Sequence, residues 1–158
     1  MKKRLLAVLM IAVFCFAAVG CGGKSDLIKV GIINNDPNES GYRTANDADM
    51  KKTFTAENGY EASFAYSLKN DEQIAAAQKM IQDGVDYLLL SAAGTAGWDG
   101  VLQDAKKAGI RVILFDRTID ADASLYEASI VSDMAKEGET FAFGVVFRVY
   151  DSCLVNIL

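Results

Sequence analysis

Apolar and polar residues are distributed along this chain in a pattern that predicts five buried strands separated by helices. The strands are short runs rich in β-branched and other large apolar residues, each followed by a small or polar loop. The predicted strands are residues 27–33, 60–66, 85–90, 110–115 and 125–131. The run at 85–90 is apolar enough to be covered on both faces of a sheet.

Between these strands, apolar residues at helical spacing and typical end signals predict helices. The predicted helices run from 40 or 41 to about 57, from 70 or 71 to 83, and from 98 to 108, and a last one includes 134–143. Asn70-Asp71 is predicted to cap the second helix, and Ser132 or Asp133 the last. Gly59 is expected to end the first helix in a left-handed conformation.

Alternating strands and helices with short links predict the α/β class: a three-layer αβα fold with a mostly parallel sheet. In such sheets ligands bind beyond the carboxyl ends of the strands. That rule selects the loops at 34–43, 66–70, 91–98 and 116–124.

The first segment is typical of an export signal. Lys2, Lys3 and Arg4 precede the apolar run 5–19, which is shorter than the about 18 residues that span a bilayer. The run ends in Gly20-Cys21, and a small residue before a Cys at this place resembles a bacterial lipoprotein signal. In that family the Cys is acylated. We therefore expect a lipoprotein signal peptide at 1–20, a lipidated linker at 21–26 and lipidation of Cys21. A plain signal peptide cut nearby is the alternative.

Composition excludes several classes of function. The 158 residues include no His, which removes histidine general bases and Ser-His-Asp triads. The three Cys form no C-x-x-C pair, which excludes a zinc knuckle. The net charge is −5 without a basic stripe, so nucleic acid is not an expected partner. We expect no cofactor and no bound metal.

The selected loops contain candidate ligand-binding residues: Tyr42, Arg43, Trp98, Asp116 and Arg117. A carboxylate accepts hydrogen bonds from hydroxyls, and a guanidinium donates through a fixed fork. Aromatic rings cover the C–H face of a sugar. These side chains suit a neutral polyhydroxylated ligand. The alternatives are a surface pair at Asp116-Arg117 and core packing for Tyr42 and Trp98.

Several motifs occur in a familiar order along residues 27–140. They are Gly41-Tyr42-Arg43-Thr44-Ala45-Asn46, Asp71-Glu72-Gln73-Ile74, Gly97-Trp98, Ala108-Gly109-Ile110 and Phe115-Asp116-Arg117. The sequence resembles the type I periplasmic sugar-binding proteins of ABC transporters, a group that includes ribose and galactofuranose binders. The resemblance implies a monosaccharide ligand held between two lobes and an ABC transporter permease as partner.

The resemblance also implies site residues. Arg43 matches the arginine of a Trp-Arg motif in which Tyr42 replaces the more usual Trp, and Asp116 and Arg117 match an Asp-Arg pair. Trp98 matches the tryptophan of a Gly-Trp motif, and Asp133 matches an acidic position at the start of the last helix.

The resemblance ends at about Thr140. We therefore expect a single N-terminal sugar-binding lobe at 27–143 and an aberrant apolar tail at 144–158, which has the character of a truncated or frame-shifted end. A genuine short terminal strand is the alternative. A lone lobe loses about half of the hydrogen bonds to a sugar, at about 1 kcal/mol each. Because about 4 kcal/mol is a thousandfold in affinity, binding is expected to be millimolar or absent.

Other functions are less consistent with these features. An enzyme is not expected: Asp116, Asp120 and Asp122 are clustered acids of the kind that hydrolyse glycosides, but no nucleophile–base pair accompanies them. Repressors of the LacI type begin with a helix-turn-helix, whereas this chain begins with an export signal. The protein is expected to be exported, either periplasmic or anchored on the outer face of the cytoplasmic membrane. A sensory lipoprotein that presents its ligand to a membrane receptor stays an open alternative.

Overall fold

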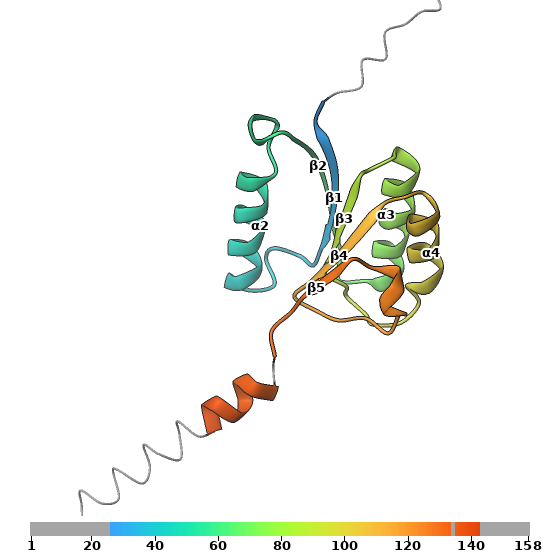
Figure 1. The fold of residues 1–158 in the computed structure, drawn as a ribbon. Helices are drawn as coiled ribbons and strands as arrows, with labels where there is room; N and C mark the ends of the chain where they lie inside the picture. The colour runs from blue at the N-terminus through green and yellow to red at the C-terminus, as the bar shows by residue number, and fades with distance from the viewer. Residues whose placement is uncertain (1–25, 134, 143–158) are drawn as a thin grey trace, which may run out of the picture.

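The computed structural model describes residues 26–133 and 135–142, which build one five-stranded sheet (Figure 1). Its order is β2-β1-β3-β4-β5, and every neighbouring pair is parallel. The strands are β1 (Ile28–Asn34), β2 (Tyr60–Tyr66), β3 (Tyr87–Leu90), β4 (Arg111–Phe115) and β5 (Ala128–Ile130). The predicted α/β fold is confirmed.

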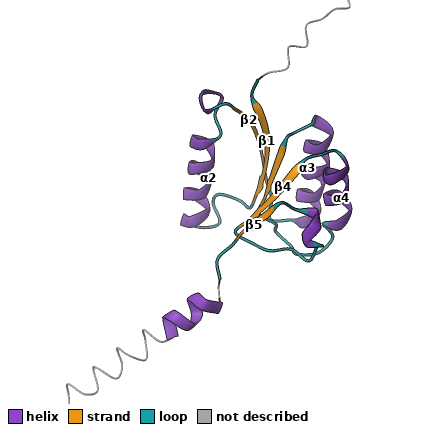
Figure 2. Cartoon of the chain, in the orientation of Figure 1, coloured by secondary structure: helices purple, strands orange, loops and turns teal. Residues whose placement is uncertain are grey.

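Helices cover both faces of the sheet (Figure 2). Helix α2 (Gly41–Thr53) lies on one face, and α3 (Asn70–Asp83) and α4 (Asp99–Lys107) lie on the other. Two 3₁₀ turns, η1 (Ala56–Asn58) and η2 (Ala123–Leu125), precede β2 and β5. Residues 135–142 are also helical; they are exposed and extend away from the sheet. No helix within the described residues is long and apolar enough to cross a membrane.

The predicted element boundaries are close to the observed ones, with two informative differences. The first helix ends at Thr53 instead of about 57, because the Thr55 side chain accepts the Asn58 N–H and starts η1. That turn ends at Gly59, whose φ of 89° is left-handed as predicted. The fifth strand is shorter than predicted because residues 123–125 form η2.

Both faces of the sheet are packed against apolar side chains. On the α3 and α4 side the core includes Leu88 and Leu90 of β3, Leu102 of α4, and Ala77 and Met80 of α3. A smaller core, with Val30, Ile32, Leu89 and Phe115, lies on the α2 side. The packing holds the strands in register, so the loops after β1, β3 and β4 meet at one edge of the sheet.

Gly31 is placed where α3 approaches β1 closely. A Cβ built at this position would lie 2.7 Å from Met80 Sδ. Only glycine leaves room for this approach without a shift of Met80. Because Met80 lies in the last turn of α3, the contact packs the end of that helix closely against β1.

Candidate functional site

A hollow of about 1030 Å³ opens at the carboxyl ends of the strands. One wall of the hollow is α2. The other walls are the loop after β3, the end of β4 with the loop that follows it, and the end of β5 with the residues that follow it. Tyr42, Arg43, Asp116 and Arg117 all line it. The structure therefore brings together four side chains that the sequence analysis had selected from two different loops.

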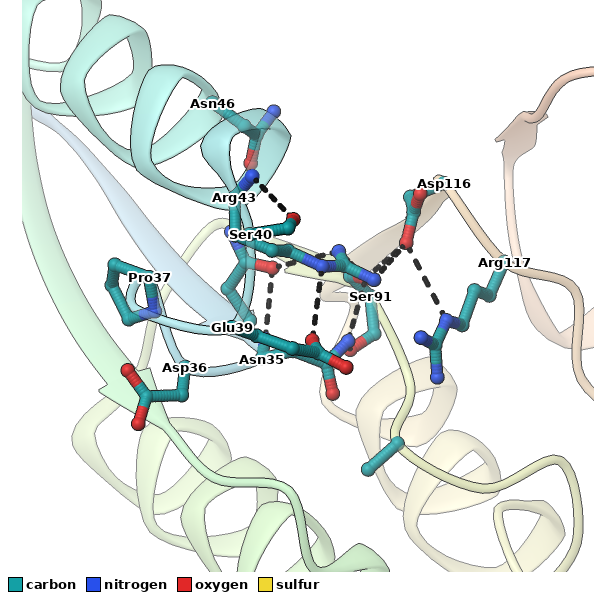
Figure 3. Close-up of polar contacts among 12 residues, drawn as sticks. Asn35, Asp36, Pro37, Glu39, Ser40, Arg43, Asn46, Ser91, Asp116 and Arg117 are labelled. Atoms are coloured by element: carbon teal, nitrogen blue, oxygen red, sulfur yellow. Dashed lines mark hydrogen bonds and ion pairs between the residues drawn. The ribbon is translucent and has the colours of Figure 1, made fainter.

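Arg43 is the central side chain of this hollow. It lies in the first turn of α2, where the Ser40 hydroxyl caps the helix by accepting the Arg43 backbone N–H. The residue is only 4% exposed. Its Nη2 lies 2.7 Å from Asp116 Oδ2, and its Nε lies 3.4 Å from Glu39 Oε2 (Figure 3). Two carboxylates thus compensate a nearly buried guanidinium and fix its orientation.

Beneath Arg43, the ends of β1 and β3 supply a polar floor. Arg43 Nη1 donates to Ser91 Oγ at 3.1 Å and to Asn34 Oδ1 at 3.5 Å. The Ser91 hydroxyl in turn donates to Asp116 Oδ2 at 3.1 Å. Ser91 therefore contacts both members of the Arg43–Asp116 pair. The sequence analysis placed Ser91 and Asn34 in the selected loops but did not name them as binding residues. Their positions directly at the ends of two predicted strands could have identified them.

Asp116 adopts an unusual backbone conformation. Its φ is 66°, the sole positive φ of a non-glycine residue in the described part of the chain. Asp tolerates this region better than most residues, at a cost on the order of 1 kcal/mol. The turn places the carboxylate between Arg43 and Arg117, whose Nε lies 3.7 Å from Oδ2. The strained turn and the ion pairs together orient the Asp116 carboxylate at the rim of the hollow.

Tyr42 provides an aromatic surface beside the ion pair. The residue is 55% exposed, and the Arg43 guanidinium carbon lies 5.5 Å from its ring centroid. Partial burial and the negative charge of Asp116 raise the pKa of the Tyr42 hydroxyl, although the positive charge of Arg43 opposes this. The phenol therefore stays protonated at neutral pH and remains a hydrogen-bond donor.

Trp98 does not line the hollow, contrary to its selection as a ligand-binding residue. It is 0% exposed and belongs to the core on the α3 and α4 side of the sheet. Its indole N–H donates to the Gly94 carbonyl oxygen at 2.9 Å. The apolar surroundings and the satisfied N–H show core packing, the alternative that the sequence had left open. Through this hydrogen bond, Trp98 holds the loop after β3 from the core side.

Asp133 is also not among the residues that line the hollow. Its carboxylate accepts the Lys136 backbone N–H at 3.0 Å and caps the helical stretch 135–142. The sequence analysis had predicted that either Ser132 or Asp133 would cap this helix. It lines a separate hollow with side chains of that stretch.

The predicted cap of α3 at Asn70 is wrong. Lys69 occupies the N-cap position, and its side chain makes no capping bond. Asn70 Nδ2 donates instead to the Ala96 carbonyl oxygen at 2.9 Å. The competing partner is a backbone acceptor in the loop after β3, which a local sequence pattern does not reveal.

Two further predictions concern lipidation and metals. Cys21, the predicted lipidation site, lies outside the described residues. Within the described residues, no group of three His, Cys, Asp or Glu side chains is placed to hold a metal ion.

Comparisons with known proteins find a matching family model and several related proteins. The sequence model of a family described as periplasmic binding protein domain matches residues 30–142. The fructose import binding protein FruE of Bifidobacterium longum is 34% identical over 130 residues, which are 80% of this chain and 39% of that protein.

Two solved structures have the same fold as this chain and a sequence identity to it similar to that of FruE. A Mycobacterium smegmatis protein in complex with β-D-fucofuranose is 35% identical with a TM-score of 0.70, and the match covers 78% of this chain and 41% of that one. The binding protein of the arabinose ABC transporter from Shewanella sp. ANA-3, bound to α- and β-L-arabinofuranose, is 31% identical with a TM-score of 0.69, over 77% of this chain and 40% of that one. The chain spans about two fifths of the length of these relatives. Because the family match covers most of the chain and the fold agrees, this chain belongs to the family of periplasmic binding protein domains.

Proposed function

We propose that this chain serves as a sugar-binding component of an ABC transporter and that its hollow contacts one side of a monosaccharide. The observation that carries the proposal is the nearly buried Arg43, held between Glu39 and Asp116 at the carboxyl ends of parallel strands. Ligands of such sheets bind at this edge. The partner of the protein in transport would be the membrane permease.

The chemistry of the hollow suits a polyhydroxylated ligand. The Asp116 carboxylate accepts hydrogen bonds, whereas the Arg117 guanidinium and the Tyr42 hydroxyl donate them. The half-exposed Tyr42 ring offers an apolar surface for the C–H face of a sugar. The Arg43–Asp116 pair compensates its own charge, which favours a neutral ligand over an ionised one.

A sugar in its furanose form is the ligand class that we propose. The support comes from two relatives, one solved with β-D-fucofuranose and the other with L-arabinofuranose. Since the chain spans about two fifths of the length of its relatives, we propose that the described lobe supplies only part of the contacts. Millimolar affinity is expected for the chain alone, because several hydrogen bonds of about 1 kcal/mol each are not made.

Titration by ¹H–¹⁵N NMR tests this proposal at the affinity expected. L-Arabinose, added to tens of millimolar, should shift the signals of Tyr42, Asp116 and Arg117 in a saturable manner. Arg43→Met should abolish the shifts. Arg111→Met is the matched control, because Arg111 is an exposed arginine at the opposite end of β4 and contacts Tyr87. Shifts that persist in Arg43→Met, or that disappear equally in both variants, would contradict the proposed site.

We also propose export and lipid anchoring through Cys21, with residues 1–20 removed as a signal peptide and 21–26 as the linker to the lobe. The support is the basic start, the apolar run and the small residue before Cys21. Mass spectrometry of the protein from bacterial membranes should find an acylated N-terminal Cys21. Cys21→Ser should leave the protein without the lipid. A soluble mature protein that begins elsewhere would show that a plain signal peptide is the correct interpretation.

A further inference from the structure

The side-chain amide of Gln73 is buried beneath the hollow and does not line it. Gln73, in the first turns of α3, is 1% exposed. Its Nε2 donates to the Ser67 carbonyl oxygen at 2.9 Å and lies 3.3 Å from the carbonyl oxygens of both Asn34 and Ser91. Its Oε1 accepts the Ala93 backbone N–H at 2.8 Å. One side chain therefore joins the backbone beyond three neighbouring strands, β1, β2 and β3.

Two of these backbone partners belong to residues that hold Arg43. The side chains of Asn34 and Ser91 accept hydrogen bonds from Arg43 Nη1, and the Ser91 hydroxyl also donates to Asp116. Gln73 thus fixes the main chain of both residues whose side chains orient the ion pair. Its fourth partner, Ala93, lines the hollow itself.

The amide matches this set of partners better than any other side chain of its size. An NH₂ group carries two hydrogens for three carbonyl oxygens, so the two longer contacts share one hydrogen. The amide oxygen serves the N–H of Ala93. A methionine would leave the N–H and the carbonyls without this partner, and a carboxylate would face the carbonyls with a negative oxygen.

We propose that Gln73 is a positioning residue for the hollow: it sets the Arg43–Asp116 pair by holding the backbone of Asn34 and Ser91. The proposal deepens the proposed function and rests on it as far as sugar affinity is concerned. The orientation of Arg43 is a separate consequence, which can be measured without any sugar.

The test compares Gln73→Met and Gln73→Glu with the same substitutions at Gln78, an exposed glutamine of the same helix. In Gln73→Met, the Ala93 amide should exchange with solvent roughly tenfold faster, as expected when one buried hydrogen bond is lost. The Arg43 Nε–H signal should move, and the affinity for L-arabinose should fall severalfold. The Gln78 variants should match the wild-type chain in all three measurements.

The Gln73→Glu variant adds a signature that a merely structural role does not have. Burial against carbonyl oxygens raises the pKa of the introduced carboxyl above the ordinary value of about 4.3. Protonation at lower pH returns one O–H donor, so the Arg43 signal should move back toward its wild-type position between pH 8 and pH 5. The wild-type chain, measured at each pH, shows how much of the change in the Arg43 signal comes from titration of Glu39 and Asp116 and not from the introduced carboxyl. If Gln73→Met does not fold, the Gln73→Glu variant still tests whether Gln73 orients Arg43.

The outcomes separate the two proposals. Folded Gln73 variants with lower stability but an unchanged Arg43 signal and unchanged affinity would overturn the positioning role. If L-arabinose shifts no signal of the wild-type chain while the Arg43 signal responds to Gln73→Met, the proposed sugar function fails and the positioning of Arg43 by Gln73 stands.

Discussion

Removing the charge of Asp116 should destabilise the fold by leaving the Arg43 guanidinium undercompensated. Asp116→Asn keeps the size of the side chain, and Asn also tolerates the positive φ of 66° found there. The substitution removes the anion that lies 2.7 Å from Arg43 Nη2. Glu39, with its carboxylate 3.4 Å from Nε, is unchanged.

The magnitude follows from the geometry of the pair. At 2.7 Å the attraction between unit charges is about 6 kcal/mol at an effective dielectric constant of 20, before desolvation is subtracted. Removing one partner of a buried pair costs about 3–5 kcal/mol. The Asp116 side chain is 18% exposed and Glu39 keeps part of the compensation, so we expect about 2–3 kcal/mol for Asp116→Asn.

Urea unfolding followed by fluorescence measures this loss. The chain has a single Trp, and Trp98 is fully buried, so its emission reports the transition. With an m-value of about 2 kcal/mol/M, the midpoint should fall by about 1–1.5 M. Asp83→Asn is the control, because the Lys79–Asp83 pair is solvent-exposed and such pairs contribute about 0–1 kcal/mol. Equal losses in Asp116→Asn and Asp83→Asn would refute the compensation of Arg43 by Asp116.

Two further predictions concern residues away from the hollow. Burial acts to raise the pKa of the Asp47 carboxyl, but hydrogen bonds from Lys51 and Tyr66 outweigh it and the pKa is lowered. The stability that Asp47 contributes is therefore present above its ordinary pKa of about 3.9 and is lost as the pH falls through the lowered value. Tyr66→Phe removes one of these hydrogen bonds and should therefore narrow the difference in melting temperature between pH 7 and pH 2.5. An unchanged difference would show that the Tyr66 hydroxyl does not lower the pKa of Asp47. Trp98→Phe should cost about 1–3 kcal/mol in urea unfolding followed by circular dichroism, since it leaves the Gly94 carbonyl without its indole partner. L-Arabinose should still shift the Tyr42 signal of this variant, and loss of that shift with the fold intact would restore Trp98 to the binding site.

The class of fold and the edge of the sheet at which the site lies could be predicted from the sequence alone. Buried strands have short apolar runs and helices have a regular apolar face, and both are local patterns. Tyr60–Tyr66 was predicted with its observed bounds for this reason. The rule that ligands bind beyond the carboxyl ends of parallel strands then selected Arg43 and Asp116 from loops that are distant in the chain.

Which of the selected side chains face the hollow could not be predicted from the sequence and was found from the tertiary structure. Trp98 was selected by the same loop rule as Arg43, and Asp133 by the family resemblance. Trp98 packs in the core, and Asp133 caps a helical stretch outside the hollow. Gln73 lies in one of the motifs quoted above, but no local pattern assigned it a role, because its partners lie 6–39 residues away in sequence. Local patterns report the preference of each segment for helix or strand. Side-chain partners are chosen by contacts between segments, which exist only once the sheet has brought its strand ends together.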